Sequence, residues 1–267
     1  MAIWVALILG IVQGLTEFLP VSSSGHLTLL GKIFGIGETT FLITILLHVA
    51  TLFAVLFVLR KEIWELIKNP FSRQACNLYL ATIPTVLIVF LAKGVIDNVL
   101  ENTKLLPYFF LLTALLLLVT YFISKNQEKK NAQKSYTVES GFLRNNLTSI
   151  VMGVTQGLAV LPGISRSGST ICAGLLCGED RKNVAKFSFL MSLPVIIGSM
   201  LYEIIKGDFN ALGEEGMAAP TIVAFLSAFI VGIVSIKFML KVVEKGKYYY
   251  FSIYLFAISI ISFFVVY

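Results

Sequence analysis

Two short polar stretches interrupt an otherwise apolar sequence, and they contain most of the residues that could do chemistry. The first begins with Gln13 and Glu17 and continues through a serine loop to His26. Glu17 is the only acidic residue before Glu38, and it lies one helical turn after Gln13, so the two side chains share a helix face. A lone carboxylate within an apolar helix is costly and by default indicates a functional site.

The serine loop that follows Glu17 supplies hydroxyl groups, backbone N–H groups and an imidazole. A nucleophilic or proton-transfer role fits His26, and the alternative is a polar side chain that binds a buried carbonyl. Ser22 and Ser24 are typical of helix N-caps. The loop therefore predicts either an acid–base centre built around Glu17 or a capped break between two helices.

The second stretch contains Arg166, the only cation between Arg144 and Arg181, within Ser-Arg-Ser-Gly-Ser-Thr. A guanidinium, several hydroxyls and a helix N-terminus together form an anion site, and phosphate fits it best. With Glu17 and His26 on the first stretch, the sequence contains the parts for phosphoryl chemistry: a nucleophile, a proton carrier and charge stabilisation. His48 lies within an apolar run, where it could line the same cavity or make a structural hydrogen bond.

The composition places these residues in a membrane. Of the 267 residues, 57% are hydrophobic and 13% are charged, and the mean hydropathy is +0.87. Soluble domains contain about 25% charged residues, so soluble enzymes, disordered chains, collagen-like chains and disulfide scaffolds are excluded. We expect the net charge of +6 to lie in cytoplasmic loops near anionic headgroups rather than on nucleic acid. The three cysteines show no metal-ligand spacing, and the first cation is Lys32, so no cleaved signal peptide is expected.

Six apolar runs are long enough to span a bilayer. They are residues 41–59, 77–97, 105–123, 186–205, 220–241 and 248–267. Residues 1–34 and 147–178 behave differently, because a Pro-Ser-Gly cluster divides each into two half-length helices. A broken backbone at membrane depth survives only where protein or a wet cavity surrounds it. These two stretches therefore predict broken helical hairpins that re-enter the membrane.

The two broken stretches are related by an internal repeat. Gln13-Gly14-Leu15 recurs as Gln156-Gly157-Leu158, at an offset of 143 residues. Each copy is followed by three spans, so the second copy enters from the opposite face, as in inverted-repeat transporters. We expect an all-α integral membrane protein with a first repeat at 1–123, a cytoplasmic linker at 124–146 and a second repeat at 147–267. This topology gathers most lysines and arginines on one side and places both termini outside.

The motifs resemble those of one known family. Residues 13–26 resemble the Glu/Gln-x-x-x-Glu motif and serine loop of the undecaprenyl-diphosphate phosphatases of the bacitracin-resistance type. Residues 162–170 match that family's Pro-Gly-x-Ser-Arg-Ser-x-x-Thr motif, and residues 179–194 also look similar. The resemblance covers essentially the whole chain. It implies a bacterial plasma-membrane enzyme that hydrolyses undecaprenyl diphosphate, with a divalent cation, Mg²⁺ or Ca²⁺, as cofactor.

The resemblance also implies roles for individual residues. Catalytic roles fall on Glu17, Ser23, His26 and Arg166. The diphosphate would be bound by Ser22, Ser24, Gly163, Ser165, Arg166, Ser167 and Thr170. The metal would be held by Glu17 and Gln13, but an amide cannot act as a base and is a weaker ligand than a carboxylate. The nucleophile stays open between Ser23, His26 and an activated water.

A transporter is the alternative function. Inverted repeats with broken helices are typical of transport proteins, so the same anion site could serve a carrier or flippase of a lipid phosphate. The expected partners are a polyprenyl diphosphate and the bilayer, with no nucleic acid, and a homodimer is left open. Phosphate release without a second compartment would favour the enzyme, and flux into sealed vesicles without hydrolysis would favour the transporter.

Overall fold

The computed structural model describes residues 2–35, 40–131, 143, 145–206 and 218–267, and all regular structure in these residues is helical. The first half contains α1 (Ile3–Thr16), α2 (Ser23–Phe34), α3 (Thr40–Val58), α4 (Arg60–Lys68), α5 (Arg73–Leu91), α6 (Lys93–Glu101), a 3₁₀ turn (Thr103–Leu105) and α7 (Leu106–Asn131). The second half contains α8 (Asn146–Leu158), α9 (Arg166–Leu176), α10 (Arg181–Lys206), α11 (Ala218–Glu244) and α12 (Tyr250–Val266). The prediction of an all-α chain is confirmed for the described residues.

Several of these helices meet the length and apolarity that a membrane span requires. Four do so by themselves, namely α5, α7, α10 and α11. Helices α3 and α4 meet the criteria only together, and they are bent by 79° at Leu59. Helices α1 and α12 are apolar but shorter. The chain is therefore a multi-pass membrane protein. The predicted run at 77–97 is divided, because α5 ends at Leu91 and α6 begins at Lys93.

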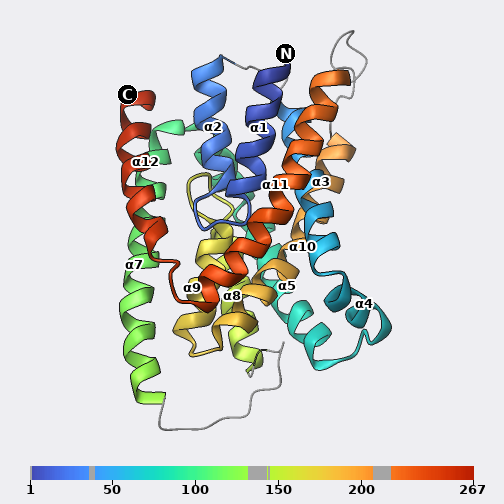
Figure 1. Ribbon diagram of the computed structural model, residues 1–267, viewed down its shortest axis with the longest axis vertical. Helices are drawn as coiled ribbons and strands as arrows, with labels where there is room; N and C mark the ends of the chain where they lie inside the picture. The colour runs from blue at the N-terminus through green and yellow to red at the C-terminus, as the bar shows by residue number, and fades with distance from the viewer. Residues whose placement is uncertain (1, 36–39, 132–142, 144, 207–217) are drawn as a thin grey trace.

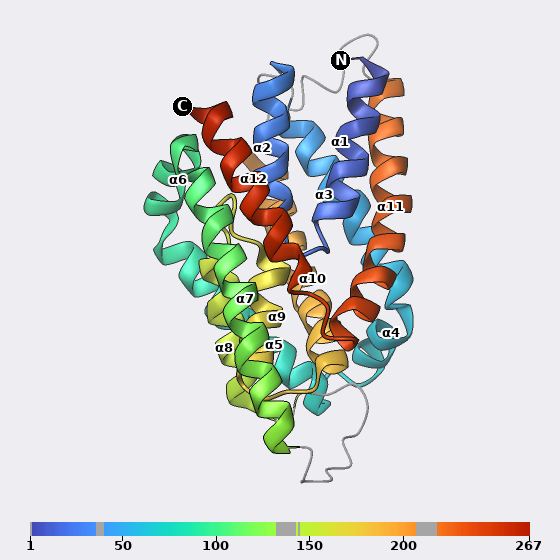
Figure 2. The ribbon, with the colours of Figure 1, turned by 60° about the vertical axis from the view of Figure 1, so that its left-hand side comes forward.

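Both broken stretches fold as pairs of short helices (Figures 1 and 2). Ser22 caps α2 by accepting a hydrogen bond from the backbone N–H of Gly25, and it has a positive φ of 68°. Ser165 caps α9 in the same way, with the N–H of Gly168 as donor. Gly163 in the second turn also has a positive φ, 94°, which glycine adopts without steric cost. The serines that the sequence identified thus begin the second helix of each pair.

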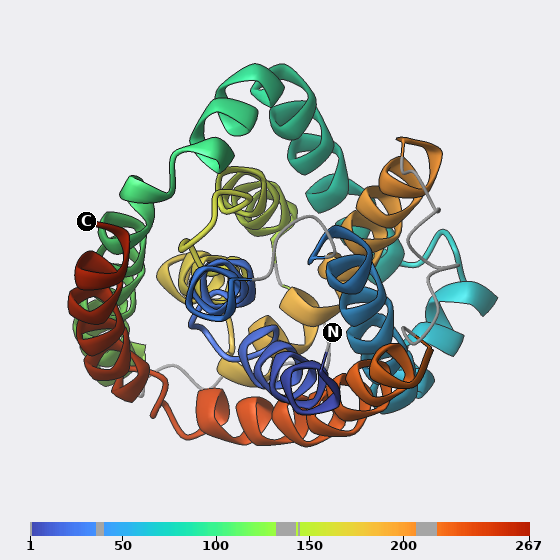
Figure 3. The same cartoon turned by 90° about the horizontal axis from the view of Figure 1, so that it is seen from above.

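The two helix pairs lie in opposite halves of the molecule along its long axis (Figure 1). The α1–α2 pair occupies one half and the α8–α9 pair the other, with their turns facing each other (Figure 1). Seen along the long axis, α3, α5, α7, α10, α11 and α12 form a ring around the two pairs (Figure 3). Helix α7 packs beside α12, and α11 packs beside both α1 and α3. The outer helices therefore hold the two turns near the centre of the protein.

Glycines allow the first helix of each pair to pack closely on an outer helix. A Cβ atom at Gly10 of α1 would overlap the carbonyl of Ala224 on α11, and one at Gly153 of α8 would overlap the carbonyl of Ala81 on α5. Small residues at helix contacts are the usual means of close approach in membranes. The two contacts correspond, since Gly10 and Gly153, like Ala81 and Ala224, are 143 residues apart.

We expect Gly153→Ala to destabilise the protein by about 1–3 kcal/mol, the usual cost of overpacking a close contact. The new methyl group would force α8 away from the Ala81 carbonyl. Gly198→Ala is the matched control, because Gly198 lies within α10 and a Cβ atom there meets nothing within 4 Å. Alanine in a helix is favoured over glycine by about 1 kcal/mol, so this control should keep or raise the melting temperature in detergent. Equal melting temperatures for the two variants would contradict the close packing of α8 on α5.

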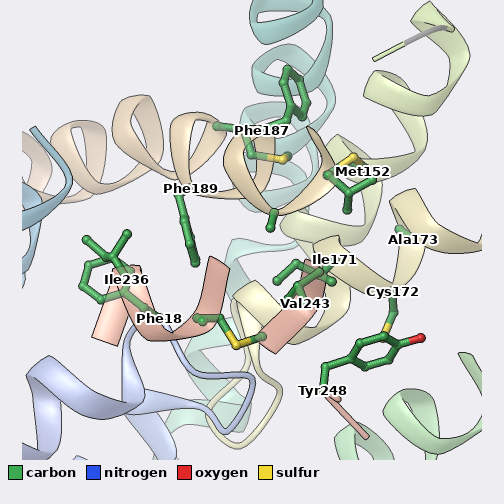
Figure 4. Packing of buried hydrophobic residues seen from close by; sticks show 14 of the residues in the cluster. Phe18, Met152, Ile171, Cys172, Ala173, Phe187, Phe189, Ile236, Val243 and Tyr248 are labelled. Atoms are coloured by element: carbon green, nitrogen blue, oxygen red, sulfur yellow. The ribbon is translucent and has the colours of Figure 1, made fainter. Parts of the chain in front are cut away.

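A large apolar cluster fixes the turn that carries the first polar stretch. Phe18, directly after Glu17, is 1% exposed and packs edge-to-face on Phe189 of α10, with ring centroids 5.6 Å apart. Ile236 of α11 belongs to the same buried cluster (Figure 4). Because the neighbouring side chain is locked in the core, the backbone of Glu17 has little freedom to move.

Candidate active site

The turns of the two helix pairs are joined by hydrogen bonds. The backbone N–H of Gly163 donates to Oγ of Ser22 over 3.0 Å. The hydroxyl of Ser167 donates to the carbonyl of Leu19, also over 3.0 Å. Each turn thus supplies a donor to the other. The structure brings together two sequence motifs that are far apart in the chain.

Glu17 lies at the centre of this junction, with its side chain 3% exposed. Its Oε1 accepts a hydrogen bond from Nη2 of Arg166 in an ion pair. Its Oε2 accepts hydrogen bonds from Oγ of Ser23 over 2.5 Å and from Nε2 of Gln13 over 3.0 Å. The buried carboxylate is therefore compensated by one cation and two neutral donors, as a buried charge requires.

His48 joins the site from α3. Its Nε2 lies 3.8 Å from Oε2 of Glu17, and its Nδ1 lies 2.7 Å from the carbonyl of Thr44. A carbonyl only accepts, so Nδ1 carries the proton that binds Thr44. The sequence left His48 open between a cavity residue and a structural hydrogen bond. The structure shows the hydrogen bond, to Thr44, and places the other ring nitrogen beside Glu17. The sequence feature that pointed to His48 was that the chain contains only two histidines.

The hydrogen bonds of His26 do not involve Glu17 or Ser23. Its Nδ1 is 2.7 Å from the carbonyl of Ser22, and its Nε2 is 2.7 Å from the hydroxyl of Tyr254 on α12. The imidazole also stacks on the Tyr254 ring, with centroids 5.7 Å apart, and meets Phe110 edge-on. In this arrangement both ring nitrogens already have partners. Sequence reasoning did not identify Tyr254, because nothing local distinguishes it from the other tyrosines of the apolar runs.

The buried hydroxyls of the second motif bind protein groups. Oγ of Ser165 accepts from the N–H of Gly168 over 3.1 Å. The Thr170 hydroxyl donates to the carbonyl of Arg166 and lies 2.6 Å from Oγ of Ser188. Thr113 of α7, which the sequence did not single out, accepts from the N–H of Ser165 over 3.1 Å. These contacts hold the start of α9 in place, and with it the Arg166 backbone.

Four polar side chains at the junction remain partly accessible. The side chains of Arg166 and His48 are 21% and 29% exposed, and Ser23 and Ser24 are half-buried. Arg166 follows the N-cap of α9 and Ser23 follows the N-cap of α2. Helix N-termini carry partial positive charge and favour anions. Among the described side chains, the Arg166 guanidinium is hydrogen-bonded only to Glu17, so several of its N–H donors can bind an anion.

One acceptor at the junction is suited to a cation. Oε1 of Gln13 is buried and has no hydrogen-bond partner among the described residues. The described residues include no cluster of three His, Cys, Asp or Glu side chains that could bind a metal. Glu17 and Gln13 alone would thus supply one carboxylate and one amide oxygen. This small set fits Mg²⁺, which keeps several waters and takes most other ligands from substrate phosphates.

A family model confirms the resemblance that the motifs suggested. Residues 6–261 match the model described as bacitracin resistance protein BacA. The chain belongs to this family. An undecaprenyl-diphosphatase of Carboxydothermus hydrogenoformans is 40% identical over 96% of this chain and 94% of that protein. Proteins of the same name from Bacteroides fragilis and Treponema denticola are 37% and 39% identical, each over 96% of this chain and over 96% and 94% of their own lengths.

Proposed function

We propose that this BacA family member is a membrane phosphatase that hydrolyses undecaprenyl diphosphate to undecaprenyl phosphate and inorganic phosphate. The observation that carries the proposal is the junction of Arg166 from one helix pair with Glu17 and Ser23 from the other. Anion-binding donors and a hydroxyl on a buried carboxylate are what phosphoryl transfer needs. The names of the relatives favour this activity over transport. It would recycle the carrier lipid for cell-wall synthesis and confer bacitracin resistance.

In the proposed reaction, Arg166 and the N-termini of α2 and α9 bind the diphosphate. Oγ of Ser23 attacks the terminal phosphorus, and its proton passes to Glu17, to which it is hydrogen-bonded. The bond from that phosphorus to the bridging oxygen breaks, and undecaprenyl phosphate leaves. A water oxygen then bonds to the phosphorus of the phosphoserine, and the bond from that phosphorus to Oγ of Ser23 breaks. Glu17 returns its proton to Oγ, and the proton lost by the water leaves with the inorganic phosphate. The 2.5 Å contact of Ser23 with Glu17, and the engagement of both His26 nitrogens elsewhere, support Ser23 over His26 as the nucleophile.

A divalent cation would be held by Glu17 and by the free Oε1 of Gln13. When bound, it would neutralise charge on the phosphate oxygens. Glu17 already accepts three hydrogen bonds, so we expect the affinity for the cation to come mainly from the substrate phosphates. The phosphatase should thus require added Mg²⁺ or Ca²⁺.

We also propose the finer membrane topology. The α1–α2 and α8–α9 pairs would be re-entrant hairpins, and α3, α5, α7, α10, α11 and α12 would be six spans in two inverted repeats. The proposal is supported by the matched packing of α1 on α11 and α8 on α5. The boundaries remain 1–123, 124–146 and 147–267, with the linker in the cytoplasm and both termini outside.

The function is tested by phosphate release from the purified, detergent-solubilised protein given a polyprenyl diphosphate, with and without Mg²⁺ or Ca²⁺. Metal-dependent release without a second compartment is the expected result. Binding of the lipid without any release, together with flux of a lipid phosphate into sealed vesicles, would overturn the phosphatase and support a transporter.

Ser23→Ala should lower kcat by about 10³-fold or more if Ser23 forms the covalent intermediate, because the nucleophile is lost. Ser24→Ala is the matched comparison, since this neighbouring hydroxyl is also half-buried. Its expected role is to bind the diphosphate, so its loss should raise KM and leave kcat within about tenfold of the wild type. Quenching the wild-type reaction early and mapping phosphopeptides by mass spectrometry should find phosphate on Ser23. A Ser23→Ala enzyme within tenfold of the wild type would instead indicate an activated water as nucleophile.

A further inference from the structure

A pocket of about 300 Å³ lies at the bend between α3 and α4, far along the chain from the catalytic motifs. Its lining comes from the end of α3, the start of α4 and one residue of α11: Phe57, Val58, Arg60, Lys61, Glu62 and Lys237. It lies at the same end of the molecule as the end of α7 and the start of α8 (Figure 1). In the proposed topology, this end faces the cytoplasm.

The pocket carries an excess of positive charge. Glu62 is the only carboxylate among the described lining residues, and Oε1 of Glu62 already accepts a hydrogen bond from Nζ of Lys186 over 2.6 Å. Partial burial would raise the pKa of the Glu62 carboxyl, but the hydrogen bond and charge of Lys186 outweigh this and lower the pKa below its ordinary value. Glu62 therefore stays ionised and paired with Lys186.

The three cations of the lining are not paired in this way, although the charge of Lys61 also helps to lower the pKa of the adjacent Glu62. Within the described part of the chain, Arg60, Lys61 and Lys237 form no ion pair within 4 Å, and all three are exposed. The Arg60 guanidinium lies over the ring of Phe57, 5.4 Å from its centroid, and donates to the Phe57 carbonyl. This contact fixes one cation directly beside an apolar surface.

Helix α4 places the pocket at the level of the lipid headgroups. It turns 79° away from α3, so it runs roughly along the membrane surface if α3 spans the bilayer. Trp64 and Phe71, on and just after α4, are 58% and 90% exposed, and Lys68 lies over the Trp64 ring. Exposed aromatic residues mixed with lysines are typical of helices that lie in the membrane interface.

We propose that this pocket binds the phosphate of an anionic membrane phospholipid. Arg60, Lys61 and Lys237 bind the phosphate oxygens, and the acyl chains lie along Phe57 and the outer face of α3. Basic pockets at the cytoplasmic ends of membrane helices bind anionic headgroups by this combination of charge and depth. The site is separate from the catalytic junction and does not depend on the phosphatase activity.

The test is native mass spectrometry of the full-length protein in a neutral detergent, titrated with phosphatidylglycerol or phosphatidylcholine of matched chains. The wild type should retain phosphatidylglycerol preferentially. The double variant Lys61→Gln/Lys237→Gln should retain it about 25-fold less, because each basic residue near an anionic lipid contributes roughly fivefold. The control Lys125→Gln/Lys182→Gln removes two exposed lysines outside the pocket and should match the wild type.

Two further measurements test the role of charge and the identity of the ligand. Glu62→Gln removes the only carboxylate among the described lining residues and should strengthen retention of phosphatidylglycerol. Inorganic phosphate at millimolar concentration should not displace the lipid, and displacement would mean that free phosphate is the ligand. Equal retention of the two lipids, or equal loss in the double variant and its control, would overturn the proposal. Each variant is verified as folded by its melting temperature and by phosphate release from a polyprenyl diphosphate in detergent without added phospholipid.

Discussion

Arg166→Ala should reduce kcat/KM for a polyprenyl diphosphate by about 10³-fold or more, the range seen when an arginine that stabilises phosphoryl transfer is removed. Arg166 is the only described cation hydrogen-bonded to Glu17, and it stands at the N-terminus of α9. Without it, no described lysine or arginine would remain beside the buried Glu17 carboxylate to bind the negatively charged diphosphate. The measurement is phosphate release at saturating Mg²⁺ over a range of substrate concentrations.

The expected fall in kcat/KM of Arg166→Ala has to be distinguished from the effect of misfolding. Removing one partner of a buried ion pair destabilises a protein by about 3–5 kcal/mol, and the Glu17 side chain is only 3% exposed. Arg166→Lys keeps the charge but loses the planar fork, so it should fold and still lose about 10–100-fold in rate. The double variant Arg166→Ala/Glu17→Gln should recover stability without activity. Near-normal rates for a folded Arg166→Ala protein would contradict the proposed site.

The fold was largely predictable from the sequence where one physical rule dominates. The cost of burying unpaired backbone groups in lipid requires helices, and the apolar runs predicted the positions of α3, α7, α10, α11 and α12. The division of α5 from α6 was not predicted, because the apolar pattern continues past Lys93 while the helix does not. The sharp bend at Leu59 was also missed, since the hydropathy of a segment does not record the direction of its axis.

The candidate site was predictable in its charged residues but less so in its neutral ones. Glu17 and Arg166 stood out because a charge in an apolar sequence is costly, and the structure brings them into contact. The roles of the hydroxyls depend on tertiary contacts that no spacing reveals. Thr113 and Tyr254 reach the motifs from α7 and α12, so only the packed structure identifies them.

Glu17→Gln should lower kcat by about 10²–10⁴-fold, the usual contribution of a general acid–base group. Glutamine keeps the shape of the side chain and can still accept a hydrogen bond from Ser23, but it cannot take a proton from that hydroxyl. It also removes the carboxylate that is hydrogen-bonded to Gln13 and that would hold a divalent cation with it. Because the substrate phosphates supply most of the affinity for the cation, we expect the residual rate of the variant still to depend on Mg²⁺ but to need a higher concentration for half-saturation, as measured by phosphate release across a metal titration.

The matched control for Glu17→Gln is Glu62→Gln. Glu62 also accepts a hydrogen bond from a cation, Nζ of Lys186, but it lies at the bend of α3 and α4, outside the catalytic junction. Its variant should release phosphate within about twofold of the wild type, because surface ion pairs contribute little. A comparable fall in both variants would mean that loss of an ion pair, rather than loss of a proton acceptor, explains the effect at Glu17. A large fall in Glu17→Gln alone would assign the proton transfer to Glu17.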